Sequence, residues 1–490
     1  MNNFDKLQAN MKRKIKMYIR KKKYEDVLAY TEMLAELLYT YNQVYVDEEL
    51  EQNLLAVSRE IMNIHELTAN DMTNKVLFYD GFGLDIRGLA LVFLKALTKM
   101  NYEIIYVTTM TAQGTLNEIE KLATAEGIVI EYIDMSTNYI TWANQINDIF
   151  LKYKPKDAFF YTTPYDVSAT IVFEAYNGIV NRYQIDLTDH AFWLGKYAFD
   201  YCIELRNVGS QISNKYRKIA KEKMRMLPYP VRIDRSQKFE GFPFETEGKR
   251  IVFSGGALYK TLGDPENAFY WIIDQLLSQH SDLIYLYAGQ GDDCELKKII
   301  KKYPDRAFHI DERKDFFQVM ERCVIYLNTY PMFGGMMMHY AAEAKKLPIT
   351  LRHENDADGL LFEQDKLNIE YDTKEELVDD VNRLLTDQKY LDERESLLQN
   401  SVISEDKFAY ELDELLKHHT TSYELDLADI DTTKFRKEYV QRFDLKKALR
   451  NAFFRKSNIR VAKTFPIDFC VVVATIVVNK IKGCVKDDKF

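Results

Sequence analysis

The chain has 490 residues, 47% of them hydrophobic and 29% charged, and its formal net charge is −9. This length allows two or three domains with full hydrophobic cores, and the composition is that of an ordinary soluble protein. Five scattered cysteines without a CxxC spacing argue against a disulfide scaffold or a zinc site and favour a reducing compartment. No stretch reaches the roughly 18–20 consecutive apolar residues that span a bilayer, and the opening residues predict no signal peptide.

Residues 1–73 are expected to form an N-terminal helical region. Residues 24–41 carry apolar side chains at three- and four-residue spacing, and residues 47–64 repeat this pattern. The pattern predicts a helical hairpin, and no residue in it points to chemistry.

A parallel α/β domain is predicted over residues 74–240. An apolar strand at 76–80 is followed by a glycine turn at 81–88, a helix at 89–100 and a second strand at 103–108. This order is a βαβ unit, which begins a parallel sheet. Further strands are expected at 128–133, 158–161, 181–187 and 199–205. The proline-containing, aperiodic segment 227–243 is interpreted as the linker to the next domain.

The same alternation begins again after the linker and predicts a second α/β domain over residues 241–405. Strands are expected at 250–254, 283–288, 307–310 and 324–328, and helices at 267–280, 295–302 and 316–321. A glycine loop, a methionine-rich helix and one more strand follow. Two such halves predict a doubled Rossmann-like α/β protein.

The last segment, residues 406–490, is predicted to hold helices and a basic amphipathic tail. From residue 434 onward there are 15 Lys or Arg and five Asp or Glu residues, so this part carries +10 and the rest of the chain −19. A second basic patch, residues 12–23, contains no acidic residue. We therefore expect a cytoplasmic protein that binds the inner-membrane surface through its tail. The alternative is a C-terminal helix that packs on the first domain.

Glycine turns that follow strands are the first candidates for a binding site, because open parallel sheets bind ligands at the carboxyl ends of their strands. The turn at 81–88 contains Gly83, Asp85 and Arg87. Asp85 is a candidate base, and Arg87 is a candidate contact for an acceptor or a phosphate. A simple tight turn is the alternative.

Two turns of the second domain have the composition of a phosphate site. Residues 254–260 include Gly255, Gly256, Tyr259 and Lys260, so backbone amides adjoin a lysine that suits a phosphate. A solvated surface lysine is the alternative. Gly289 follows the next strand and either lines the site or only forms its turn.

Two further positions follow the remaining strands. Gly334 and Gly335 stand where a helix should begin, and there free N–H groups and the helix dipole favour an anion. Met336, the next residue, is expected either in the core or as an adaptable wall beside a ligand. Arg313 either reaches a phosphate or ribose or pairs with Asp311 or Asp315.

One more candidate site lies in the first domain, in the segment 186–195. Asp189, His190 and Trp193 follow a predicted strand there. Histidine suits proton transfer near neutral pH, and an adjacent carboxylate can orient it. Trp193 could stack on a sugar, whereas the alternative is a histidine that caps a helix over a buried Trp. The sequence shows no metal-binding motif, and its acidic α/β part does not favour nucleic acid.

Taken together, the segments 80–88, 187–195, 254–260 and 329–336 resemble those of bacterial glycosyltransferases of the GT-B fold, the kind encoded among capsule, O-antigen and exopolysaccharide genes. The resemblance covers roughly residues 75–405. It implies two Rossmann-like domains that face a cleft, no cofactor and no metal, a nucleotide-sugar donor (a UDP-sugar first) and a lipid-linked surface glycan as acceptor. Lys260, the Gly334–Gly335 amides and Arg313 would then stabilise the leaving diphosphate, and His190 or Asp85 would deprotonate the acceptor.

The sequence departs from this family at one point. Many retaining members carry two glutamates eight positions apart at the glycine loop, and those positions hold Phe333 and Ala341 here, with Glu343 out of register. The stereochemical outcome is therefore left open. Two other functions remain: a nucleotide-sugar epimerase of the same fold, and a non-catalytic subunit that binds a nucleotide sugar or a partner transferase.

Overall fold

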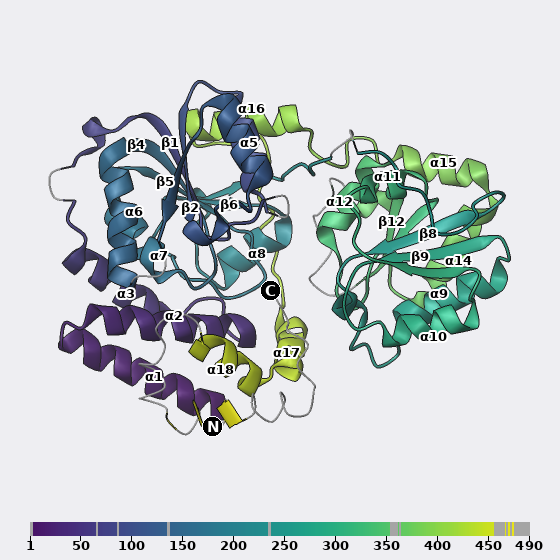
Figure 1. The fold of residues 1–490 in the computed structure, drawn as a ribbon, viewed down its shortest axis with the longest axis horizontal. Coiled ribbons are helices and arrows are strands. Elements are labelled where there is room, and N and C mark those ends of the chain that lie inside the picture. The colour runs from purple at the N-terminus through teal and green to yellow at the C-terminus, as the bar shows by residue number, and fades with distance from the viewer. Residues whose placement is uncertain are drawn as a thin grey trace. The chain divides into compact units, whose positions relative to one another are not determined.

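The computed structural model describes residues 3–64, 67–85, 88–134, 138–233, 237–352, 361 and 364–454, with the single positions 466, 469, 470, 473 and 474. The chain forms two compact units (Figure 1). Unit 1 comprises Met1–Leu205, Gly209–Leu227 and Ala409–Phe490, and unit 2 comprises Arg206–Val208 and Pro228–Phe408. Within the described residues, every helix is too short or too polar to cross a membrane.

Unit 1 is built on a parallel sheet in the order β3-β2-β1-β4-β5-β6-β7. Its strands are β1 (Thr73–Asp80), β2 (Glu103–Thr109), β3 (Val129–Ile133), β4 (Pro155–Tyr161), β5 (Asn181–Ile185), β6 (Tyr201–Glu204) and β7 (Met224–Met226). The connecting helices are α4 (Ala90–Thr98), α5 (Asn117–Glu126), α6 (Tyr139–Tyr153), α7 (Val167–Ala175) and α8 (Asn207–Lys215). The central strands are apolar throughout because helices cover both faces of a parallel sheet.

Three helices, rather than a hairpin, form the N-terminal region: α1 (Asn3–Arg20), α2 (Tyr24–Tyr41) and α3 (Glu48–Ile61). Helix α2 packs against α6 and α7 on one side and against α1 on the other. This position explains its long buried run from Val27 to Leu38. The helices are therefore part of unit 1, and the basic patch at 12–23 lies on α1 and the turn after it.

The C-terminal segment returns to unit 1. Helix α16 (Glu405–His418) is followed by an extended stretch and then by α17 (Thr433–Arg442) and α18 (Leu445–Phe454). Ala448, Leu449 and Ala452 of α18 are buried against α2. For residues 445–454 the structure thus shows a helix packed on the first domain, which was the alternative to a free anchor. The apolar run at 466–478 lies almost wholly outside the described residues.

Unit 2 repeats the architecture with a sheet in the order β10-β9-β8-β11-β12-β13. Its strands are β8 (Arg250–Gly255), β9 (Leu283–Ala288), β10 (Ala307–Ile310), β11 (Ile325–Leu327), β12 (Leu347–Leu351) and β13 (Glu370–Tyr371). Its helices are α9 (Ala268–Gln279), α10 (Cys294–Lys302), α11 (Phe316–Glu321), α12 (Gly335–Glu343), α13 (Gln364–Leu367), α14 (Lys374–Thr386) and α15 (Gln388–Ser396). Counted from its own first strand, the sheet of unit 2 has the Rossmann order 3-2-1-4-5-6, and the sheet of unit 1 has the same order with a seventh strand added at the end.

Candidate functional site

The strand order places the candidate site of unit 2 at the carboxyl ends of β8 and β11. These strands are neighbours, and their outgoing connections run to opposite sides of the sheet, which is the position at which open parallel sheets bind ligands. The turn after β8 contains Gly256 and Lys260, and the turn after β11 leads to Gly334 and Gly335. The turns that the sequence singled out thus follow two neighbouring strands at one edge of the sheet.

The turns after β8 and β11 touch each other through Lys260. Its ammonium nitrogen lies 3.3 Å from the carbonyl oxygen of Phe333, and its own carbonyl accepts the backbone N–H of Met332 at 3.1 Å. Lys260 belongs to a short 3-10 turn, Leu258–Thr261, in which the neighbouring Tyr259 is 57% exposed. The positive charge of Lys260 thus lies beside Phe333, the residue that precedes the glycine pair at the start of α12.

Asn328 shapes the loop that leads into α12. Its side-chain oxygen accepts the backbone N–H groups of Thr329 and Gly334, both at 3.0 Å. Helix α12 begins at Gly335, so the glycine pair stands at the helix N-terminus as predicted. Met336 is half-buried beside it, whereas Met338 is fully buried in the core. The first turn of α12 offers backbone N–H groups and the positive end of the helix dipole to an anion.

The backbone is tightly packed where β8 and β9 end. Gly256 donates to the carbonyl of Ala288 at 2.9 Å, and a Cβ at Gly289 would lie only 1.9 Å from the carbonyl oxygen of Gly256. Both glycines have positive φ angles, +128° at Gly256 and +153° at Gly289. The sequence predicted Gly255 in the turn after the strand, but the structure shows it as the last residue of β8. These glycines allow two turns to approach each other beside Lys260.

Arg313 is engaged with protein groups. Its guanidinium pairs with the buried Asp315, with Nε 2.7 Å from the carboxylate, and it donates to the carbonyl of Gly241 at 2.6 Å. The neighbouring carboxylate raises the pKa of Arg313 further. The ion pair with Asp315 was one of the two sequence interpretations, and it is the one that the structure shows.

In unit 1, Asp80 organises the glycine turn after β1. One carboxylate oxygen accepts the backbone N–H groups of Phe82 (2.9 Å) and Gly83 (3.0 Å), and the other accepts the hydroxyl of Tyr106 at 2.7 Å. Burial raises the pKa of Asp80 to about 6. Sequence reasoning did not assign Asp80 a role, although an Asp before Gly-Phe-Gly is the signal of such a side-chain-to-backbone turn.

The carboxylate of Asp85, a candidate base, caps a helix. Its two oxygens accept the backbone N–H groups of Glu118 and Ile119, each at 3.1 Å, at the first turn of α5. This contact is a structural role that the sequence did not predict. Arg87, the candidate acceptor contact of the same turn, lies outside the described residues.

His190 lies in the turn that follows β5. Its Nδ1 is 3.3 Å from a carboxylate oxygen of Asp189, which is buried, while the His190 side chain is 33% exposed. The backbone carbonyl of His190 accepts the side-chain amide of Asn42 from the N-terminal helices at 3.0 Å. An imidazole that is oriented by a carboxylate and open to solvent can accept a proton.

Trp193 is buried, and this corrects its assignment as a surface for a sugar. The residue is 3% exposed and packs against Phe199, with ring centroids 6.1 Å apart. The guanidinium of Arg217 lies 4.8 Å from the Trp193 ring. The ring therefore offers no open face, in agreement with the alternative of a buried Trp beneath the histidine.

Arg217, which the sequence did not single out, is a buried residue that binds the backbone on both sides of His190. It is 1% exposed and donates to the carbonyls of Asp189 (2.8 Å) and Ala191 (2.6 Å), on either side of His190. It also lies 3.5 Å from the carboxylate of Asp186. A buried arginine with these contacts fixes the backbone around the histidine.

Next to Arg217, strand pairing brings Asp186, Cys202 and Glu204 together. Their ligand atoms lie within 4.8 Å of one another, and all three residues are buried, so the group could hold a metal ion. Burial, together with the neighbouring Asp186, raises the pKa of Glu204 to about 8, and burial raises the pKa of Asp186 to about 6 although Arg217 lowers it. With Glu204 protonated, the guanidinium of Arg217 balances the negative charge of Asp186. No residue spacing in the sequence predicts this cluster.

Glu204 makes the stability of the protein depend on pH. The folded state keeps the Glu204 proton up to about pH 8, whereas an unfolded glutamate loses it near pH 4.5. Between these values the folded state binds more protons, so the free energy of unfolding falls as pH rises, by up to about 1.4 kcal/mol per pH unit. Denaturant unfolding at pH 6, 7, 8 and 9 should show a shallower fall for Glu204→Gln than for the native protein.

The exposed Glu126→Gln serves as the control for that experiment and should keep the native slope. If Glu204→Gln and the native protein lose stability in parallel, Glu204 is ionised in the folded state. The assignment of a protonated carboxyl beside Asp186 would then be wrong.

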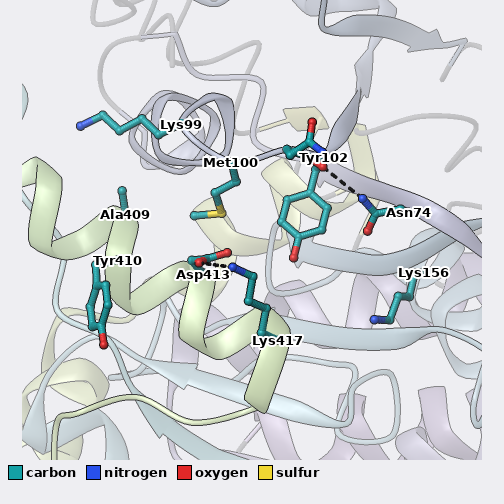
Figure 2. A pocket seen from close by; sticks show the side chains of 10 residues that line it. Asn74, Lys99, Met100, Tyr102, Lys156, Ala409, Tyr410, Asp413 and Lys417 are labelled. Atoms are coloured by element: carbon teal, nitrogen blue, oxygen red, sulfur yellow. Dashed lines mark hydrogen bonds and ion pairs between the residues drawn. The ribbon is translucent and has the colours of Figure 1, made fainter.

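A cavity of about 650 Å³ lies at the amino ends of the unit 1 strands, where β1 and β4 begin (Figure 2). It is lined by Asn74, Lys99, Met100, Asn101, Tyr102, Lys156, Ala409, Tyr410, Asp413 and Lys417. Lys417 is directed at Asp413 of the same helix, 2.6 Å away. Because open parallel sheets bind ligands at the carboxyl ends of their strands, this cavity is not part of the candidate site.

Comparison with known proteins gives a match in structure only. No family model matches the chain, and no curated protein matches its sequence. A glycosyltransferase from Rickettsia africae is similar over 71% of this chain and 100% of its own, with a TM-score of 0.52 and 14% identity. A putative UDP-N-acetylglucosamine 2-epimerase from Listeria monocytogenes is similar over 73% and 99%, with a TM-score of 0.51 and 12% identity.

A third structure, an Anabaena protein in complex with UDP and glucose, is similar over 70% of this chain and 99% of its own, with a TM-score of 0.50 and 13% identity. At such low identity the likeness concerns the fold. The chain has the GT-B fold, with two Rossmann-like parallel sheets, and the fold class expected from the sequence is confirmed.

Proposed function

We propose that the protein is a glycosyltransferase that moves a sugar from a nucleotide-diphosphate donor to a growing glycan. The observation that supports this most directly is the contact between Lys260 and the loop that opens α12. A lysine charge, a helix N-terminus and two close glycine turns form a site of the kind that binds a diphosphate. Proteins of the same fold include a glycosyltransferase and a protein whose structure was solved in complex with UDP and glucose.

In this proposal unit 2 stabilises the leaving group. As the bond between the anomeric carbon and the diphosphate oxygen breaks, negative charge develops on the diphosphate. We assign the stabilisation of that charge to the ammonium of Lys260, which contacts the loop before α12, and to the amides of Gly335 and Met336 in the first turn of α12. Arg313 has no part in this step, because its guanidinium is paired with Asp315.

The acceptor chemistry is assigned to unit 1. The acceptor hydroxyl attacks the anomeric carbon, and its proton passes to the imidazole of His190, which Asp189 orients. His190 is preferred to Asp85 as the base because both oxygens of Asp85 cap α5. The proposal includes no resident metal or cofactor.

Charge supports the proposal for the acceptor and the place of action. The segment from residue 434 onward carries +10, which suits the anionic inner face of a cell membrane. We therefore assign the protein to the synthesis of a lipid-linked surface glycan of the capsule or O-antigen type, as a peripheral membrane protein. A UDP-sugar is the donor to test first.

A nucleotide-sugar epimerase is the second candidate, and the fold match to a 2-epimerase favours it. An epimerase would convert free UDP-N-acetylglucosamine without any acceptor, whereas a transferase needs one. Incubation of the donor alone, followed by separation of the sugar isomers, therefore decides between the two. A non-catalytic subunit would bind the donor and do neither reaction.

Lys260→Ala should weaken donor binding by about 10- to 100-fold, because a hydrogen bond to a charged group contributes roughly 1.5–3 kcal/mol. The measurement is thermal unfolding with UDP, GDP, CDP, ADP and their common sugars. A ligand at 100 times its Kd adds about 2.7 kcal/mol to stability, which gives a clear shift in melting temperature. One nucleotide family should stabilise the native protein by this amount, and at the same concentration it should stabilise the variant by only about 0.4–1.4 kcal/mol.

Lys301→Ala, which removes an exposed lysine on α10 of the same unit, is the matched control and should bind like the native protein. Equal shifts for Lys260→Ala and Lys301→Ala would remove Lys260 from the donor site. No shift with any nucleotide would contradict the transferase and favour a scaffold protein.

A further inference from the structure

Helix α1 has one buried face and one basic face. Phe4, Leu7, Met11 and Ile15 recur at three- and four-residue spacing and are buried against α2. The opposite face is exposed and carries Lys6, Arg13, Lys16 and Arg20, again at helical spacing. The basic patch seen in the sequence is therefore a continuous stripe on the outside of unit 1.

Acidic side chains of α3 and its N-cap neutralise only one flank of this stripe. Lys12 pairs with Asp47, and Lys16 lies 3.1 Å from Glu49. In contrast, Lys6, Arg13 and Arg20 form no ion pair with the acidic residues that the structure describes. The outer edge of α1 thus keeps its positive charge.

The start of the basic C-terminal segment lies beside α1, although some 400 residues separate them in the sequence. The ring of Phe4 in α1 is 5.5 Å from that of Phe443, at the turn between α17 and α18, and Tyr41 contacts both rings. Figure 1 shows α1 and α18 on the same helical layer, with α2 between them and the sheet. Helix α18 exposes Lys446 and Lys447 while its apolar side faces α2.

We infer that this face, formed by the exposed basic residues of α1 and α18, is the docking surface of unit 1 for an anionic phospholipid bilayer. The acidic remainder of the chain is repelled by such a surface, so the basic layer sets the orientation. After α18 the sequence continues with Arg455, Lys456, Arg460 and Lys463 and then with the apolar run 466–478. Basic residues beside a short apolar run are typical of interfacial binding. The inference rests on the membrane association proposed above and adds the face that makes the contact.

The experiment is co-sedimentation of the full chain with vesicles of phosphatidylcholine alone or with phosphatidylglycerol added. The native protein should bind only the anionic vesicles, and 0.5 M NaCl should release it because salt screens exposed charges. The triple variant Lys6→Glu, Arg13→Glu, Lys447→Glu should bind at least about 100-fold more weakly. Each basic residue near such a surface contributes roughly 1 kcal/mol, about a fivefold change.

A control variant of equal charge, Lys249→Glu, Lys301→Glu, Lys314→Glu, changes three exposed lysines of unit 2 and should lose much less binding. Thermal unfolding of both variants checks that they fold. Native-like vesicle binding by the α1–α18 variant would overturn this face and leave membrane association standing. No binding of the native protein to anionic vesicles would overturn both, while the transferase assay is unaffected. Tighter binding to duplex DNA or RNA than to vesicles at the same salt would also overturn the inference.

Discussion

His190→Ala is expected to lower turnover by about 10²- to 10⁴-fold, the usual contribution of a general base, with little change in donor affinity. The reason is the division of roles: His190 and Asp189 belong to unit 1, whereas Lys260 and the α12 N-terminus belong to unit 2. The measurement is steady-state transfer from a radiolabelled nucleotide sugar to a membrane-derived acceptor, with donor affinity taken from thermal shifts.

The matched control is His418→Ala, which removes an exposed histidine at the end of α16 in the same unit. Asp189→Asn should lower turnover less than the loss of His190, because it removes only the group that orients the imidazole. Asp85→Asn should lower the melting temperature through α5, since its carboxylate caps that helix. If His190→Ala retains full activity, His190 is not the base.

Gly289→Ala is expected to destabilise unit 2 by about 3 kcal/mol or more and to abolish donor binding. The added methyl would lie 1.9 Å from the carbonyl oxygen of Gly256, and at φ +153° the backbone is one that other residues rarely adopt. Backbone strain and overpacking each cost roughly 1–3 kcal/mol. The clash involves main-chain atoms, so the turns beside Lys260 must move apart. Thermal unfolding with and without the donor nucleotide measures both effects.

Gly263→Ala separates the clash from the backbone strain. Gly263 also has a positive φ angle, +94°, but a Cβ there meets no heavy atom within 4 Å. This variant should lose only the smaller, conformational part of the stability and should still bind donor. Equal losses for the two variants would mean that the close approach of Gly289 and Gly256 does not matter for the site.

Much of unit 2 could be predicted from local sequence. Strands Leu283–Ala288 and Ala307–Ile310 and helix Phe316–Glu321 have the predicted bounds, because glycine or polar turns border clear apolar runs. The position of Gly334–Gly335 at a helix start follows from the same kind of signal. In unit 1, strand β7 (Met224–Met226) was not predicted, because a strand of three residues is too short to show an alternating pattern.

The details of the site that the sequence did not predict depend on contacts between distant residues. Arg217 holds the carbonyls of Asp189 and Ala191 from 28 and 26 residues away. Asp186 meets Cys202 and Glu204 only because β5 and β6 pair in one register. The burial of Trp193 follows from the packing of Arg217 and Phe199 around it. Composition and spacing alone contain no information about such contacts.

The path of the chain through unit 1 has a consequence for biosynthesis. Unit 2 is one nearly continuous stretch, Pro228–Phe408, whereas unit 1 takes residues from both sides of it. His419 stacks on Tyr201 with centroids 4.6 Å apart, Thr421 bonds to the carbonyl of Met226, and α18 covers α2. On the ribosome, unit 2 can therefore fold while unit 1 still waits for its last helices. During that interval the apolar surface of α2 that α18 later covers is available to chaperones.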